Sequence, residues 1–393
     1  MSTDIHRAGD MDAVAGRWSP LARTLHALPN WLRAAESRDG GERHYTVFDG
    51  PDGPRGGLVA RLMGEDGRFR DNPLAQLVRP DSAMRRFLAP EERRRLAAHA
   101  ERLAAAGDRL YPALVSVLPG GCLPGLLRGP AVDAGVVGEL LDELRSLAAE
   151  RGAGTTAVMH VPEADTELRG ALAGRGYVPF VSVGDCVLSV AWKDFEGYLA
   201  GLRGPRPTRV RREIRGFEES GAQLRETTPD ALGRRHAELH LAHLRRNGQE
   251  ADFDGSLGLI ESIRRHPTGR GRVLEAWRGD TLAGFVVFHD VHGVFHPTLI
   301  GVGPQEEKAF THVNLCYYGL IRIAVAEGAR SVVYGPESYD AKAFRGCAPE
   351  RRISHLRVPE ELREAVFGAA ALVDAGNRRR LSSYAWQDPG GNG

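Results

Sequence analysis

The chain has 393 residues, more than one hydrophobic core usually serves, so we expect two domains. Its 42% hydrophobic and 26% charged residues describe an ordinary soluble globular protein. Because 52 basic residues stand against 51 acidic ones, the net charge of +1 argues against a general nucleic-acid or membrane-surface binder, while it leaves room for a local basic patch.

The cysteines are far apart in the sequence, without a CxxC pair or paired histidines; they are Cys122, Cys186, Cys316 and Cys347. This spacing predicts neither a zinc site nor a disulfide framework, and four free thiols fit a reducing cytoplasm. The N-terminal segment has no apolar run typical of a signal peptide, and no apolar stretch is long enough to predict a membrane span. We therefore expect a cytoplasmic protein without a metal site.

The first half of the chain predicts one compact α/β module. Residues 1–21 are expected to form an N-terminal tail, and the apolar runs YTVF and GLVARLM flank a turn and predict a hairpin. A charged helix (APEERRRLAAHAERLAAAG), a strand (LYPALVSVLP), a helix over 134–151, a strand over 155–161, a helix over 162–175 and a strand pair near YVPFVSVGDCVLSV follow. We assign this module to residues 22–191.

The second half, residues 192–358, repeats this order. A short strand (AQLRET) precedes helices that begin near Pro229 and Ser256, and three strands follow: RVLEAWR, TLAGFVVFHD and VFHPTLIG. A helix over 311–327 and a strand over 331–334 complete a strand–helix–strand unit, and residues 359–393 are assigned to a C-terminal helix and tail. Because ligands collect at the carboxyl ends of parallel strands, the turn after Tyr334 is the first place to expect chemistry.

The run HVNLCYYGLIRIAVAEGARSVVYGPESYDAKAFRGCAP resembles the FemAB-like (peptidoglycan-biosynthesis) branch of the GNAT (Gcn5-related) N-acyltransferase superfamily. The matching residues are His312, Cys316, Tyr317, Tyr318, Gly335, Lys342 and Gly346, with further similar phrases at 111–119, 158–161 and 195–213. The resemblance implies two tandem GNAT-like modules, each a mixed antiparallel and parallel sheet flanked by helices. It also implies transfer of an activated acyl group to an amine.

The resemblance further implies a donor. In Fem-type enzymes the donor is aminoacyl-tRNA and the acceptor is a cell-wall precursor, whereas acyl-CoA users usually carry an Arg/Gln-x-x-Gly-x-Gly/Ala pyrophosphate loop. The equivalent stretch here, GPQEEKAFTHVN, lacks that pattern, and its two Glu would repel a pyrophosphate. We therefore expect aminoacyl-tRNA as co-substrate, no separate cofactor, and no DNA or membrane partner. The alternatives are an acyl-CoA-dependent N-acetyltransferase and a non-catalytic small-ligand binding protein of the same fold.

The expected acceptor is the amine of a small molecule. Asn314 stands where the family has an acidic residue, and TLIG stands where it has an aromatic strand. These two departures surround the expected acceptor pocket. They favour a specialised metabolite, as in antibiotic biosynthesis, over an ordinary cell-wall-type precursor.

Aminolysis of an ester or thioester needs a neutral amine, proximity and stabilisation of the oxyanion, but no covalent nucleophile. Only three of the 52 basic residues are lysines, so Lys342 is the leading candidate for the oxyanion or for a tRNA phosphate. His312 is the expected base, Asp340 is expected to orient the amine or take its proton, and Tyr318 is the expected general acid. A solvated lysine, a structural histidine, a turn aspartate and a core tyrosine are the ordinary alternatives. We expect substrate contacts from Tyr317, Asn314, Glu337, Tyr339, His296 and Arg345.

An arginine-rich segment follows the first module. Five of its residues are expected to bind the phosphates of a tRNA acceptor stem, with a solvated amphipathic helix as an equal alternative. These residues are Arg206, Arg209, Arg211, Arg212 and Arg215. From the sequence alone, Lys342→Ala is expected to abolish transfer and leave the fold intact.

Overall fold

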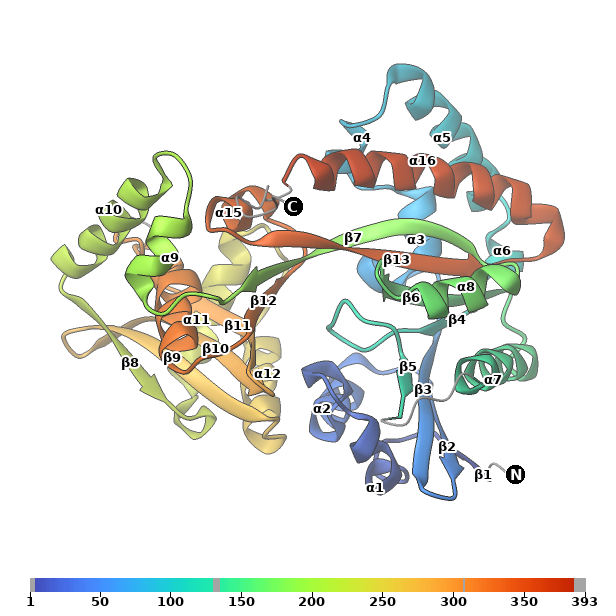
Figure 1. Cartoon of the computed structure of the whole chain (residues 1–393), viewed down its shortest axis with the longest axis horizontal. Coiled ribbons are helices and arrows are strands. Elements are labelled where there is room, and N and C mark those ends of the chain that lie inside the picture. The colour runs from blue at the N-terminus through green and yellow to red at the C-terminus, as the bar shows by residue number, and fades with distance from the viewer. Residues whose placement is uncertain (1–3, 130–134, 307, 385–393) are drawn as a thin grey trace.

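A computed structural model describes residues 4–129, 135–306 and 308–384 (Figure 1). Within these residues 13 strands form a single sheet, in the order β1-β2-β3-β4-β6-β13-β7-β12-β11-β10-β9-β8, and β5 pairs with β3. Parallel and antiparallel pairs are mixed, and helices cover both faces. The predicted α/β class with a mixed sheet is therefore confirmed.

The first half contains most of the elements expected from its sequence. Its strands are β1 (Asp4–Ala8), β2 (Arg43–Gly50), β3 (Gly53–Met63), β4 (Ala113–Ser116), β5 (Leu126–Arg128), β6 (Thr155–Pro162) and β7 (Val178–Ser189). Its helices are α1 (Ala15–Trp18), α2 (Pro29–Asp39), α3 (Pro73–Val78), α4 (Ser82–Arg85), α5 (Pro90–Ala104), α6 (Gly107–Leu110), α7 (Val136–Glu150) and α8 (Thr166–Gly174). The predicted hairpin is β2–β3, whereas the strand pair predicted near residues 177–190 is one continuous strand, β7.

The second half follows the same order. Its strands are β8 (Ala222–Thr227), β9 (Arg270–Arg278), β10 (Thr281–Val291), β11 (Val294–Val302), β12 (Ser331–Gly335) and β13 (Ala348–Arg357). Its helices are α9 (Phe195–Gly201), α10 (Arg206–Glu219), α11 (Arg234–Arg246), α12 (Phe253–Arg265), α13 (Thr311–Val313), a π-helical turn (Asn314–Gly319), α14 (Leu320–Ala326), α15 (Tyr339–Phe344) and α16 (Arg363–Ser382). The predicted strand–helix–strand unit is present, since β11 and β12 are parallel. The predicted polar turn carrying Lys342 is instead the short helix α15.

The two halves exchange strands at the centre of the sheet. β13 lies between β6 and β7, and β7 lies between β13 and β12, so each half receives a strand from the other. Figure 1 shows β7 and β13 as the long strands that connect the two halves. Because main-chain hydrogen bonds cross in both directions, a division of the chain near residue 191 does not divide the sheet.

The N-terminal segment is part of the fold, in contrast to the predicted tail. β1 pairs with β2, and Met11, Trp18 and Leu21 are buried behind these strands, where Trp18 Nε1 donates to the carbonyl of Ala27 at 2.8 Å. The amphipathic pattern of RWSPLARTLHAL, which was not used in the prediction, explains this docking, because its apolar residues need a buried face.

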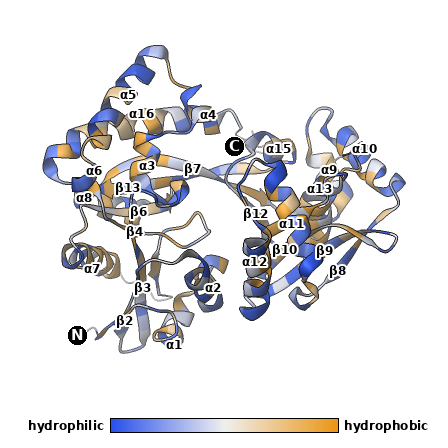
Figure 2. Ribbon diagram, turned by 180° about the vertical axis from the view of Figure 1, so that it is seen from behind, coloured by the Kyte–Doolittle hydropathy of each residue, from blue (hydrophilic) through white to orange (hydrophobic). Residues whose placement is uncertain are grey.

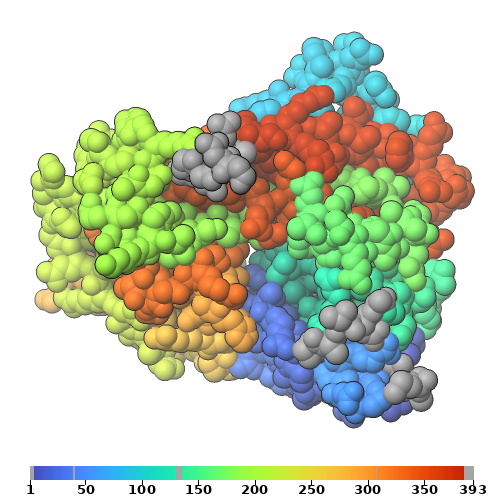
Figure 3. Space-filling view, in the orientation of Figure 1, coloured from blue at the N-terminus to red at the C-terminus, as the bar shows by residue number. Residues whose placement is uncertain are grey.

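Helix α16 returns to the first half of the chain. It packs across α5 and β7 and buries Ala365, Val366 and Ala369 with Phe180 of β7 (Figure 1). The described part of the predicted C-terminal segment is therefore a helix of that half's core, while residues 385–393 lie outside the described residues. Figure 2 shows apolar residues gathered where helices meet the sheet, and Figure 3 shows the N-terminal segment resting against the second half.

Candidate active site

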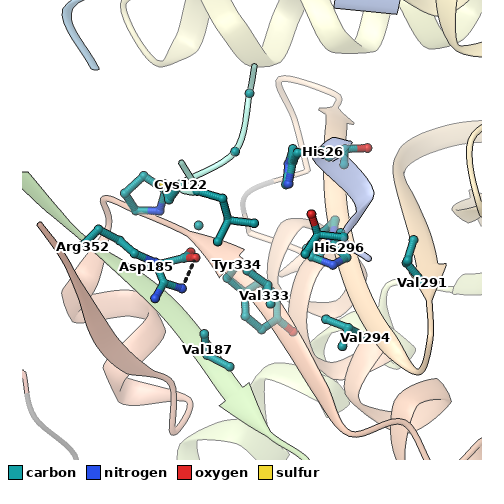
Figure 4. Close-up of a pocket in the computed structure, with 18 of the residues that line it drawn as sticks. His26, Cys122, Asp185, Val187, Val291, Val294, His296, Val333, Tyr334 and Arg352 are labelled. Carbon is teal, nitrogen blue, oxygen red and sulfur yellow. Dashed lines mark hydrogen bonds and ion pairs between the residues drawn. The ribbon is translucent and has the colours of Figure 1, made fainter. Parts of the chain in front are cut away.

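A pocket of about 600 Å³ lies between the two halves (Figure 4). The sheet supplies its floor through β7, β11, β12 and β13, and three segments of the first half form its walls, at 23–31, 68–70 and 120–123. This volume lies within the range of pockets that hold one small molecule. The pocket therefore joins segments that are more than 300 residues apart in the sequence.

The pocket exists because β11 and β12 separate. They pair only at Val294↔Ser331 and Phe295↔Val332, and Pro297, two residues further on, has no N–H to donate to a neighbouring strand. β11 also carries an irregularity in its pairing with β10 at this point. The sheet consequently opens beside His296, at the carboxyl end of β12, where the sequence predicted the chemistry.

One end of the pocket is formed by imidazole rings. His26 precedes α2 and His296 lies on β11, and their ring centroids are 5.7 Å apart at 88°. Trp31 of α2 packs edge-on against His26 at 5.0 Å and is itself fixed by a hydrogen bond to the carbonyl of Pro119. Gly121 is required here, because a Cβ at this position would stand 2.6 Å from Cγ of His26.

Both histidines of this end are neutral at physiological pH. Burial, with the neighbouring imidazoles, lowers the pKa of His26 to about 3 and the pKa of His296 to about 4. Nδ1 of His26 is buried without a hydrogen-bond partner within the described residues. A neutral imidazole has one ring nitrogen that accepts, so an imidazole that lines the pocket can accept a hydrogen bond from a substrate amine.

The other end of the pocket is charged. Nη2 of Arg352 on β13 lies 2.8 Å from Oδ2 of Asp185 on β7 and 3.1 Å from Oε2 of Glu350. Figure 4 shows Arg352, Asp185 and Cys122 together at this end, away from His26 and His296. Burial raises the pKa of the Cys122 thiol to about 12, so this cysteine is not a thiolate nucleophile at neutral pH.

Lys342 is neither a solvated lysine nor a free ammonium facing the pocket. It is 7% exposed, and Nζ donates to the carbonyls of Tyr334, Gly335 and Pro336 at 2.8–2.9 Å. These three bonds use every N–H of the ammonium. Because residues 334–336 line the pocket, Lys342 shapes the site by holding its backbone.

Tyr318 belongs to a buried network on the other face of the sheet. Its hydroxyl donates to Oε2 of Glu213, which also accepts from Nη2 of Arg345 at 3.1 Å, and Oε1 of Glu213 accepts from Nε of Arg209 at 3.0 Å. Asn314 donates to the carbonyl of Glu213 at 3.1 Å. Burial raises the pKa of Tyr318. The network ties α10 and α15 to the π-helical turn, an element often found at functional sites.

Three other side chains expected at the site, those of His312, Tyr317 and Tyr339, pack near the pocket but do not line it. His312 stacks on His243 with centroids 5.7 Å apart, and burial lowers the pKa of His312 to about 4. Tyr317 packs against Tyr334, whose backbone borders the pocket. The hydroxyl of Tyr339 donates to the carbonyl of Gly184 at 3.2 Å.

Two expected carboxylates are exposed. Asp340 accepts a long hydrogen bond from Tyr384 at 3.4 Å, and Glu337 pairs with Arg70 of the first half at 2.8 Å. Of the side chains proposed from the sequence, His296 lines the pocket directly, and Glu337 reaches its rim through Arg70.

The arginines of α10 lie outside the pocket. Arg206 donates to the carbonyl of Ala343, Arg209 to Glu213 and Arg211 to Glu196. Arg212 and Arg215 are exposed and have no side-chain partner within the described residues. Of the predicted tRNA contacts, these two remain available to an external ligand.

Sequence reasoning missed His26, Trp31, Asp185 and Arg352. The first two stand in a segment to which the sequence analysis assigned no element, and the last two lie on strands whose mutual pairing depends on the exchange at the centre of the sheet. The signal that could have found His26 and Trp31 is the cluster TLHALPNW, in which a histidine and a tryptophan accompany helix-start residues.

Solved structures define the class of fold. FemX superposes with a TM-score of 0.58 at 9% identity, covering 92% of this chain and 98% of that one. The C-terminal domain of a putative lysylphosphatidylglycerol synthetase from Agrobacterium fabrum gives 0.51 at 10%, covering 92% and 96%. A conserved protein of unknown function from Bacteroides thetaiotaomicron gives 0.52 at 11%, covering 89% and 97%. Among curated proteins, none matches this chain significantly.

The family is shown by sequence. The FemAB-like family, described as peptidoglycan biosynthesis/recognition, matches residues 96–370, and the chain belongs to this family. The resemblance predicted from the sequence is thus confirmed. Family and fold together support an acyltransferase. Within the described residues, no helix combines the length and the apolar character needed to cross a membrane.

Proposed function

We propose that this chain transfers an aminoacyl group from aminoacyl-tRNA to the amine of a small molecule bound between the two halves. In this reaction the amine nitrogen attacks the ester carbonyl, a C–N bond forms and the C–O bond to the tRNA ribose breaks. The amine proton ends on the released ribose oxygen. The observation that supports the site best is the convergence of His26 and His296, from different halves, on one pocket at the opening of the sheet.

The neutral imidazoles suit an amine acceptor. They can accept its N–H groups without repelling it, and they orient the lone pair toward a carbonyl that enters beside β12. The surrounding arginines favour the uncharged form of the amine, because nearby positive charge lowers the pKa of an ammonium group. Lys342 contributes by fixing residues 334–336 at the edge of this opening.

Two features support the choice of substrates. The volume of about 600 Å³ suits one small acceptor and is restrictive for an extended cell-wall precursor, which agrees with the predicted specialised metabolite. At the start of α13, the buried carboxylate of Glu306 accepts from Thr311 at 2.7 Å and pairs with Arg278 at 2.8 Å. An acidic group at this helix start disfavours the pyrophosphate of acyl-CoA and leaves aminoacyl-tRNA as the favoured donor.

The test is incubation of the purified chain with a mixture of small amines and either labelled aminoacyl-tRNA or labelled acetyl-CoA. We expect label in an amide product only with aminoacyl-tRNA, and RNase treatment should abolish it. Transfer from acetyl-CoA that survives RNase would instead identify an N-acetyltransferase. No transfer from either donor, with thermal stabilisation by an amine, would identify a binding protein.

A further inference from the structure

We infer that the acceptor amine also carries a carboxylate or phosphate group, which binds at the charged end of the pocket. This inference rests on the proposed function and names the chemical class of its acceptor. Two kinds of observation support it: the imbalance of charge in the lining, and a buried guanidinium N–H at this end that has no partner within the described residues.

The lining is strongly basic. Six arginines face the pocket, against two carboxylates, Asp185 and Glu350; the arginines are Arg23, Arg38, Arg68, Arg70, Arg330 and Arg352. The whole chain has a net charge of only +1, so this concentration of arginines is local. A concave surface in which one sign of charge predominates attracts a ligand of the opposite sign.

Arg352 supplies the fixed part of the subsite. It is 7% exposed, and its Nε has no partner within the described residues, although Nη2 is paired with Asp185. Nη2 also lies 3.1 Å from Oε2 of the half-exposed Glu350, while Oδ1 of Asp185 is buried without a partner and needs a donor such as a water. Buried polar atoms without partners are rare and indicate a missing ligand or water. A guanidinium with a spare donor is suited to a carboxylate or phosphate oxygen.

Two further arginines, Arg70 and Arg68, can contact an anion that enters the charged end. Arg70 pairs with Glu337, but this carboxylate is 72% exposed, so the ion pair contributes little and an entering anion can replace it. Arg68, two residues earlier, is exposed and has no side-chain partner in the described part of the chain. An anion near Arg352 therefore has two additional positive groups available at the wall of the pocket.

The anionic group of the acceptor would then bind at the charged end of the pocket and its amine at the imidazole end. Figure 4 shows Val187 and Val333 between Arg352 at the charged end and His26 and His296 at the imidazole end. A short apolar spacer between anion and amine would lie over these valines. An amine without an anionic group would leave Nε of Arg352 unsatisfied, and such a site rejects ligands that lack the matching group.

The experiment compares three small amines of similar length: propylamine without an anion, β-alanine with a carboxylate and phosphoethanolamine with a phosphate. Ligand-observed saturation-transfer NMR on the full chain measures their binding without any acyl donor. We expect saturable binding of β-alanine or phosphoethanolamine and much weaker binding of propylamine. The stronger of the two anionic ligands identifies which anion the site prefers.

Variants test the assignment to named residues. Arg68→Gln, which changes an exposed unpaired side chain, should weaken binding of the preferred anionic amine by about fivefold. Arg352→Lys, which keeps the charge but removes Nε, should weaken it by roughly tenfold or more. Arg94→Gln, an exposed arginine of α5 outside the pocket, is the matched control and should bind like the wild type.

The inference is overturned if propylamine binds as tightly as both anionic amines, if none of the three binds, or if both arginine variants bind like the wild type. The proposed function fails separately. Binding of an anionic amine without transfer from any donor would refute the proposed activity and support the anion subsite. Equally efficient transfer to propylamine and to the anionic amines would support the proposed activity and refute the anion subsite.

Discussion

Replacing Lys342 with methionine tests the role that the structure gives to this lysine. Methionine keeps most of the aliphatic stem and removes the ammonium, so the carbonyls of Tyr334, Gly335 and Pro336 lose their shared donor. Sequence reasoning placed the ammonium on the substrate and expected Lys342→Ala to leave the fold intact. The observed contacts predict a loss of stability as well as a loss of transfer.

The magnitude follows from the three hydrogen bonds. Each bond from a charged donor contributes about 1.5–3 kcal/mol, but the three share one ammonium, and burial of Lys342 lowers its pKa, which shows a desolvation cost. The net loss is therefore well below the sum, and we expect the free energy of unfolding to fall by about 2–4 kcal/mol. Lys342→Arg should not restore it, because a planar fork cannot cap three converging carbonyls in the same way.

Urea unfolding followed by circular dichroism measures this change, and amide-product formation measures transfer. Lys193→Met is the control, because Lys193 is exposed, and it should change the unfolding free energy by less than about 0.5 kcal/mol. If Lys342→Met loses transfer while its stability stays that of the wild type, the ammonium acts on substrate and the positioning role is wrong. Unchanged stability together with unchanged transfer would refute both roles.

Three further predictions concern other parts of the molecule. Burial lowers the pKa of the His160 imidazole to about 3, so near pH 6.5 the imidazole is protonated in the unfolded chain and stays neutral in the folded chain. The contribution of neutral His160 to the free energy of unfolding is therefore fully present above pH 6.5 and is lost as the pH falls below it. His160→Asn, which tolerates the local φ of 60°, should reduce the loss of unfolding free energy between pH 7 and pH 5 by about 2 kcal/mol, and an undiminished loss would contradict this. Glu213→Gln leaves Arg345, 5% exposed, without its buried counter-charge and should cost about 3–5 kcal/mol in urea unfolding; a change under about 1 kcal/mol would show that the ion pair is dispensable. The double variant Arg212→Gln, Arg215→Gln should weaken tRNA binding. In filter binding at several salt concentrations, the slope of log affinity against log salt concentration should fall by the equivalent of about two phosphate contacts. Unchanged binding would show that α10 does not contact the tRNA.

Local pattern was enough to predict the main strands and the crossover helix of the second half. The alternation in RVLEAWR, TLAGFVVFHD and VFHPTLIG marked β9, β10 and β11, and the apolar periodicity from Thr311 marked the helix that crosses to β12. The family resemblance also lies in this stretch, which is why it was visible without the fold. The turn after Tyr334, where the same unit led us to expect the chemistry, lines the pocket that we propose as the site.

Long-range pairing could not be read in this way. Nothing local to β13 indicates that it inserts between β6 and β7, because a strand sequence does not name its partner. The positions of Asp185 and Arg352 depend on that insertion, and the position of His26 depends on the docking of the N-terminal segment. Lys342 was found by its rarity, but its three carbonyl partners depend on the coiling of residues 339–344 into α15, which the sequence suggested to be a turn.

The most direct test of the central claim is the rate of amide formation by His26→Phe, measured beside its unfolding free energy. Phenylalanine keeps a flat ring against Trp31 and His296 and removes both nitrogens, one of which has no partner in the described structure. We predict stability equal to or slightly above that of the wild type, and a rate that is lower by about 100-fold, as for loss of a hydrogen bond that positions the amine against the carbonyl. Transfer at the wild-type rate would contradict the claim that the acceptor amine reacts in the pocket between the two halves.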